Sequence, residues 1–146
     1  MEGKQTGFTL IELILVLSVL STVVIYPIIN LTSIREDYIL RSEVKKLYSI
    51  ILATRQEAVS TYQPQSISFD KRTYFKSSVQ GDIKEYNLAP EIKIEAINFA
   101  FGRKELIFQP LGTCLGGNIV ISNQQGSSYC IIVYGATGRV RWERCG

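Results

Sequence analysis

Apolar residues fill one unbroken block in the first third of the chain. The segment 8–31 reads FTLIELILVLSVLSTVVIYPIINL, and its one charged residue is Glu12. No charge occurs between Leu13 and Ile34. A helix needs about 20 apolar residues to cross the hydrocarbon core of a bilayer. The pattern therefore predicts a membrane-spanning helix over 8–33, with a kink at Pro27 or an ordinary tolerated membrane-helix proline there.

The apolar positions then recur with the period of a helix. They follow steps of three and four residues and indicate an amphipathic helix over 34–62 that packs against a sheet. Gln63 and Pro64 end it, because the residue before a proline resists the helical conformation. The apolar stripe consists of Leu40, Val44, Leu47, Ile51, Ala58 and Tyr62.

From residue 63 to 146 the pattern changes to short alternating runs, most of them separated by Gly, Pro, Asn, Asp or Ser. Such runs predict antiparallel strands. One long helix followed by strands gives an α+β fold, with the helix packed on a C-terminal antiparallel β-sheet domain. The predicted strands are Ser66–Phe69, Thr73–Phe75, Lys84–Leu88, Ile92–Glu95, Ile97–Phe101, Glu105–Phe108, Asn118–Ser122, Tyr129–Tyr134 and Arg139–Trp142.

Composition narrows the function classes. The chain has 146 residues, a net charge of +3, three Cys and no His. A zinc or iron–sulfur site is not expected from so few soft ligands. Phosphate-binding loops, nucleophile elbows and HExxH motifs are missing from the sequence. We therefore expect no catalytic residue, no metal and no cofactor, and a protein that is not an enzyme.

Glu12 is the feature that a plain membrane anchor does not explain. An ionised carboxylate in lipid is costly, about 2.5 kcal/mol or more at the centre of a helix and less near its end. Such a residue is by default functional, and it requires a partner for its charge.

The residues around Glu12 carry a specific resemblance. Gly7-Phe8-Thr9-Leu10-Ile11-Glu12 resembles the prepilin signature of type IV pilins and type II secretion pseudopilins. The resemblance implies that a prepilin peptidase removes residues 1–7 by cutting between Gly7 and Phe8. It also implies that the new N-terminal Phe8 is N-methylated, and that other pilins in a helical fibre and an inner-membrane assembly platform are partners.

In that family Glu12 is thought to pair with the N-terminal ammonium of a neighbouring subunit. Such a pair neutralises two buried charges and sets the register of the incoming subunit. The rival interpretation is an uncleaved signal anchor on a protein of another function.

The last third of the chain adds a second resemblance. A Phe-x-Pro-x-Gly segment at 108–112, a hairpin, and Gly138-Arg139-Val140-Arg141 resemble the C-terminal region of the GspH/FimT group of minor pilins and pseudopilins. The competence pseudopilins of Gram-positive bacteria have a similar layout. The fibre could therefore serve secretion, DNA uptake, adhesion or motility.

Orientation follows from the resemblance alone. It implies a single-pass protein of the inner or cytoplasmic membrane, with the C-terminal domain outside the cytoplasm and later in an envelope or surface fibre. Charge counting opposes this, since Arg35, Arg41, Lys45 and Lys46 follow the apolar block and would favour a cytoplasmic domain.

The three cysteines leave more than one disulfide open. The turn at 135–138 would set Tyr134 opposite Arg139, which makes Cys130 diagonal to Cys145. A diagonal pair is too distant in a regular sheet, but Cys145 lies next to the chain end and can shift. We favour Cys130–Cys145, with Cys114–Cys130 equal to it if the strand breaks early. Three reduced thiols are the alternative in a poorly oxidising envelope.

The C-terminal arginines suggest a nucleic-acid contact. Arg139 and Arg141 share a strand face with Tyr134, and Arg144 follows. Arginines beside an aromatic ring suit a DNA backbone and a stacked base. The alternative is a solvated strand face, partly balanced by Glu143.

Overall fold

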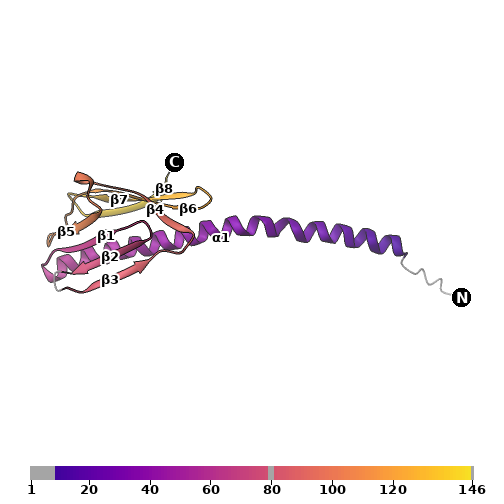
Figure 1. Cartoon of the computed structure of the whole chain (residues 1–146), viewed down its shortest axis with the longest axis horizontal. Coiled ribbons are helices and arrows are strands. Elements are labelled where there is room, and N and C mark those ends of the chain that lie inside the picture. The colour runs from indigo at the N-terminus through magenta and orange to yellow at the C-terminus, as the bar shows by residue number, and fades with distance from the viewer. Residues whose placement is uncertain (1–8, 79–80, 146) are drawn as a thin grey trace. The chain divides into compact units, whose positions relative to one another are not determined.

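The computed structural model describes residues 9–78 and 81–145, with the side chains of 23–33 and 78 omitted. Among these residues, one long helix is followed by eight strands and one short 3-10 turn (Figure 1). The elements are α1 (Leu10–Thr61), β1 (Gln65–Phe69), β2 (Thr73–Ser78), β3 (Ile83–Asn87), β4 (Ile92–Phe99), η1 (Ala100–Gly102), β5 (Glu105–Phe108), β6 (Gly117–Asn123), β7 (Ser128–Tyr134) and β8 (Arg139–Arg144).

The chain divides into two compact units at Arg35 and Glu36. In the first unit, Leu10 begins α1, and the helix continues past position 27 without interruption. The kink at Pro27 stays a prediction.

The second unit holds the rest of α1 and two four-stranded sheets. The strand orders are β3-β2-β1-β5 and β4-β6-β7-β8. Every pairing is antiparallel. The predicted α+β fold, a long helix packed on antiparallel sheets, is therefore confirmed.

The helical stripe is buried as predicted over most of its length. Leu40, Val44, Leu47, Ile51 and Ala58 are fully buried and belong to one core with both sheets. The position between Ile51 and Ala58 is filled by Thr54, which is also fully buried. Its hydroxyl donates to the carbonyl oxygen of Ile50 at 2.8 Å, so the core tolerates a polar side chain there.

The prediction for Tyr62 was wrong. Its ring is 75% exposed, and its backbone has φ 58°, the left-handed conformation that commonly ends a helix. Because Tyr62 has left the helical path before Pro64, its side chain no longer follows the stripe.

Two predicted strands are one. Ile92–Glu95 and Ile97–Phe101 form the single strand β4, with a register shift between Ile94 and Ala96. A β-bulge of this kind reverses the alternation of faces, which explains why the sequence pattern breaks there. The strand ends at Phe99, because Phe101 adopts a left-handed backbone with φ 63° in η1.

Candidate functional site

Thr9 caps the N-terminus of α1. The backbone N–H of Glu12 donates to the Thr9 carbonyl oxygen at 3.1 Å and faces Thr9 Oγ1 at 3.4 Å. This Thr-x-x-Glu spacing is that of a capping box, which places Glu12 at the third helical position. Sequence reasoning missed the cap, although the spacing carried the signal. Gly7 and Phe8, the predicted cleavage and methylation sites, lie outside the described residues.

The first turns of α1 present Glu12 among apolar side chains. Leu10 and Ile11 are each 76% exposed, and Glu12 is exposed beside them. A carboxylate at the start of a helix also interacts favourably with the helix dipole. The arrangement offers an apolar surface with one negative charge at a defined position.

Three described hydroxyl groups farther along this unit are hydrogen-bonded within the helix. Ser18, Ser21 and Thr22 each donate to the carbonyl oxygen three residues earlier, at 2.8 Å. Buried hydroxyls without a partner are unfavourable in apolar surroundings, so these bonds suit a helix in contact with lipid or protein. Among the described residues, no helix contains a stretch both long and apolar enough to cross a membrane.

The second candidate site lies on the outer face of β7 and β8. Tyr134 is directly opposite Arg139, which confirms the predicted register. The Tyr134 ring is 43% exposed, and Arg139 is exposed beside it. One aromatic ring and one guanidinium therefore share an accessible surface at the turn end of the hairpin.

The other two arginines are placed differently. Arg141 Nη2 lies 3.2 Å from a carboxylate oxygen of Glu143 and forms an exposed ion pair. β8 continues to Arg144, so strand alternation puts Arg144 on the face opposite Arg139 and Arg141. The candidate nucleic-acid surface thus reduces to Tyr134, Arg139 and a partly neutralised Arg141.

The structure bonds Cys130 to Cys145, with the two Cα atoms 5.5 Å apart. The backbone N–H of Cys145, the residue just beyond β8, donates to the Ser128 carbonyl oxygen at 3.0 Å. This bond holds Cys145 within reach of β7. Cys114 is the free thiol. Burial raises the pKa of Cys114 to about 11, and the nearby Arg55 guanidinium partly opposes this.

Comparison with known proteins places these features in context. The prokaryotic N-terminal methylation motif matches residues 3–25. Competence protein ComGD of Bacillus subtilis (strain 168) is 32% identical over 144 residues, which span 97% of this chain and 96% of that protein.

Two solved structures share the fold. The minor pseudopilin EpsH from the type 2 secretion system of Vibrio cholerae has a TM-score of 0.59 and 11% identity, covering 72% of this chain and 96% of that one. The type IV minor pilin FimU of Pseudomonas aeruginosa (strain PAO1) has a TM-score of 0.56 and 17% identity, covering 71% and 87%.

Proposed function

The chain belongs to the family of type IV pilin-like proteins that includes competence protein ComGD, and from this premise we propose how it is processed and assembled. It is a minor pilin or pseudopilin, a structural subunit of a type IV pilus-like or type II secretion fibre. Members of this class are membrane-anchored, are processed by a prepilin peptidase and assemble with other pilins.

The proposed processing is cleavage between Gly7 and Phe8, followed by N-methylation of Phe8. The observation that carries it is the methylation motif over residues 3–25. Residues 1–7 are then a leader, residues 8–33 the membrane and assembly helix, residues 34–62 its amphipathic continuation and residues 63–146 the β-rich domain. The domain faces the outside of the cell membrane and enters the fibre from there.

The proposed role of Glu12 is to pair with the ammonium of a neighbouring, already assembled subunit. The capped helix start supports this, because it puts an exposed carboxylate at a fixed position on an apolar helical surface. Two opposite charges that meet in low-dielectric surroundings attract strongly, whereas either one alone is costly there. The pair would therefore select one register of docking.

Mass spectrometry of the native protein tests the processing. We expect a chain that has lost residues 1–7 and gained about 14 Da on Phe8, since one methyl group replaces one hydrogen. A full-length chain that begins with an unmodified Met1 would instead support the signal-anchor alternative.

A second candidate function is DNA binding, within a fibre for DNA uptake. The observation that favours it is the exposed Tyr134 ring directly opposite Arg139. In a gel shift with single-stranded DNA, the full chain in detergent should bind at low salt. Arg139→Ala with Arg141→Ala should reduce the salt slope by roughly 0.7 for each lost phosphate contact.

Lys45→Ala with Lys84→Ala is the matched control for that experiment, because it removes two exposed cations from α1 and β3. An equal loss in both double variants would indicate attraction by net charge alone. Failure to shift DNA at low salt would exclude this second function and leave the structural role intact.

A further inference from the structure

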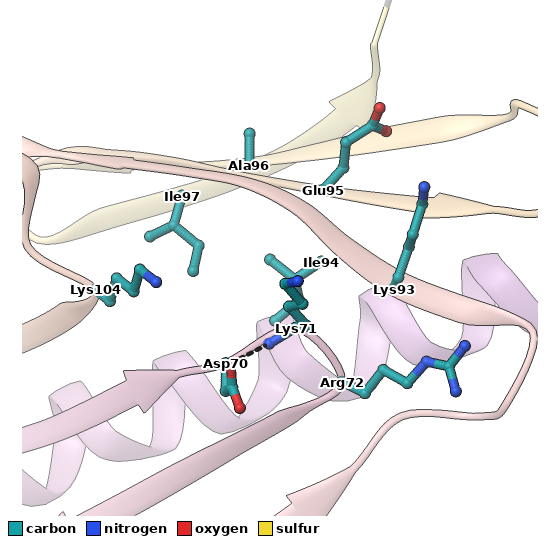
Figure 2. Close-up of a pocket in the computed structure, with 9 residues that line it drawn as sticks. All are labelled: Asp70, Lys71, Arg72, Lys93, Ile94, Glu95, Ala96, Ile97 and Lys104. Atoms are coloured by element: carbon teal, nitrogen blue, oxygen red, sulfur yellow. Dashed lines mark hydrogen bonds between the residues drawn. The ribbon is translucent and has the colours of Figure 1, made fainter.

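A groove runs beside the edge strand β4. It holds about 500 Å³ and lies between the turn that joins β1 to β2 and the side of β4 that faces away from β6. Residues 93–97 of β4 line one wall, and Lys71 and Lys104 lie across from them (Figure 2). Ile94 and Ile97 supply the apolar surface between these cations.

The groove carries a positive charge. Its lining includes four cationic side chains against two carboxylates. Asp70 is one of these carboxylates, and its Oδ1 already accepts the backbone N–H of Lys71 at 2.8 Å. Glu95 is the other, and it extends from β4 on the same side as Lys93, away from the turn (Figure 2). Glu95 therefore offsets Lys93, and the other three cations of the lining remain against the single carboxylate of Asp70.

The backbone of β4 is open along this groove except at Ile94, whose N–H is already bonded. β4 is the edge strand of its sheet. Among the described residues, the one backbone hydrogen bond that joins 93–97 to the far side runs from Ile94 N–H to the Lys71 carbonyl oxygen at 2.8 Å. An edge strand with unpaired N–H and C=O groups is a template for a further strand. The bulge between Ile94 and Ala96 limits that addition to a short segment.

An adjoining hollow provides further unpaired polar groups. It holds about 480 Å³ and shares Arg72, Lys93 and Glu95 with the groove. Ser122 and Asn123, which line it, are 3% and 4% exposed. Asn123 Oδ1 accepts the N–H groups of Gln125 and Ser127. This fixes the amide orientation, and Asn123 Nδ2 and Ser122 Oγ find no partner among the described residues.

We propose that this groove binds a short, extended acidic segment of another polypeptide, which adds to the free edge of β4. Backbone pairing would supply the main-chain contacts, and alternate acidic side chains would meet Lys71 and Lys104. A nucleic acid fits less well, because none of the described residues that line the two hollows is aromatic, and a base would have no ring to stack on. The site is separate from the N-terminal signature and from the β7–β8 face, so it does not depend on the proposed function.

Fluorescence anisotropy with the full chain in detergent tests this. The probe is a labelled seven-residue peptide with Asp at its second, fourth and sixth positions and Thr elsewhere. We expect saturable binding at low salt. The double variant Lys71→Glu with Lys104→Glu should weaken this binding about tenfold, because it places carboxylates opposite the acidic side chains of the peptide. Lys45→Glu with Lys84→Glu makes the same change in net charge elsewhere and should leave binding nearly unchanged.

A second probe separates strand addition from simple charge attraction without any protein variant. The same peptide, N-methylated on residues two to six, keeps its charge but cannot pair along an edge, and it should not bind. Equal binding of the methylated peptide would overturn the proposal, as would equal weakening by both double variants. Tighter binding of a single-stranded oligonucleotide of equal charge at this groove would overturn it in favour of a nucleic acid.

Discussion

Arg55 of α1 holds two separate loops of the β domain. Its Nε donates to the carbonyl oxygen of Gly112 at 3.1 Å, and its Nη2 donates to that of Thr137 at 3.1 Å. The first loop precedes β6 and the second joins β7 to β8. A single planar guanidinium thus connects the helix to the hairpin that carries Tyr134 and Arg139.

Replacing Arg55 should loosen these loops. Hydrogen bonds from a charged donor contribute about 1.5–3 kcal/mol, so we expect Arg55→Ala to lower the free energy of unfolding by about that amount. Arg55→Lys should recover little of this stability, since a single ammonium cannot reproduce the two N–H donors that the planar guanidinium directs at the two carbonyl oxygens. Hydrogen exchange should quicken at the Cys114 and Gly138 amides, which donate to Gly135 and Tyr134. Lys45→Ala, a change at an exposed position of the same helix, should alter neither the free energy of unfolding nor the exchange of these amides. Unchanged protection of the two amides in Arg55→Ala would contradict this account.

Gly138 and Gly126 form a matched pair for testing close packing. Both have positive φ, 60° and 85°. A Cβ at Gly138 would clash with the Gly112 carbonyl oxygen, whereas one at Gly126 meets nothing within 4 Å. Gly126→Ala should therefore cost only the left-handed strain of about 1–2 kcal/mol. Gly138→Ala should lower the free energy of unfolding by about 1–3 kcal/mol more than Gly126→Ala does, as measured by thermal unfolding. Equal losses in the two variants would show that the two loops move apart freely.

The Cys130–Cys145 bond should contribute to stability by closing a loop. The two residues are 15 apart in sequence, and a loop of that length corresponds to about 3 kcal/mol in the chain-entropy account. We expect Cys145→Ser to lower the free energy of unfolding by about 2–3 kcal/mol in urea titrations. A reductant should destabilise the unmodified chain to the same extent and leave the variant unaffected. If the reductant destabilises Cys145→Ser as much as the unmodified chain, its effect does not come from the Cys130–Cys145 bond.

The free thiol should respond to pH. Burial raises the pKa of Cys114 from 9.0 to about 11, so in the folded chain its thiolate becomes abundant only near pH 11. Alkylation should be slow at pH 8 and rise about tenfold per pH unit, because the thiolate is the reactive form. The unfolded chain loses this proton at lower pH, so the contribution to stability is present below pH 9 and is lost between pH 9 and 11. A plateau of the alkylation rate near pH 9 in folded protein would contradict the burial effect.

Charge pairing by Glu12 makes a separable prediction. Glu12→Val should still be cleaved after Gly7, since the scissile bond is intact, but its incorporation into fibres should fall sharply. Quantitative immunoblots of sheared fibres and of membranes measure the two steps. Glu12→Asp, which keeps the charge on a shorter side chain, should retain more incorporation than Glu12→Val. Normal incorporation of Glu12→Val would rule out the pairing role.

Periodicity in the sequence predicted the helix, its buried stripe and most strands, because burial of apolar side chains dictates all three. It did not predict the single β4, since the bulge after Ile94 reverses the alternation that defines a strand. It also misplaced Tyr62, whose left-handed backbone overrides the helical period.

The candidate surfaces were predicted only in part. The turn at 135–138 correctly predicted that Tyr134 pairs with Arg139. The extension of β8 to Arg144 was not evident from the sequence, so Arg144 was grouped with the other two arginines. The groove beside β4 combines Lys71, Lys93 and Lys104, which are distant in sequence, and only the tertiary fold brings them to one place.

The hydroxyls of Ser18, Ser21 and Thr22 have a consequence for transfer of the subunit. Each bonds to a carbonyl of its own helix, so these groups carry their partners along when the helix leaves the lipid and enters a fibre. The transfer needs no exchange of hydrogen bonds at those three positions. In the proposed assembly, Glu12 is then the one group among the described side chains from Leu10 to Thr22 whose energy depends on the destination, and it would be the criterion by which the fibre admits the helix.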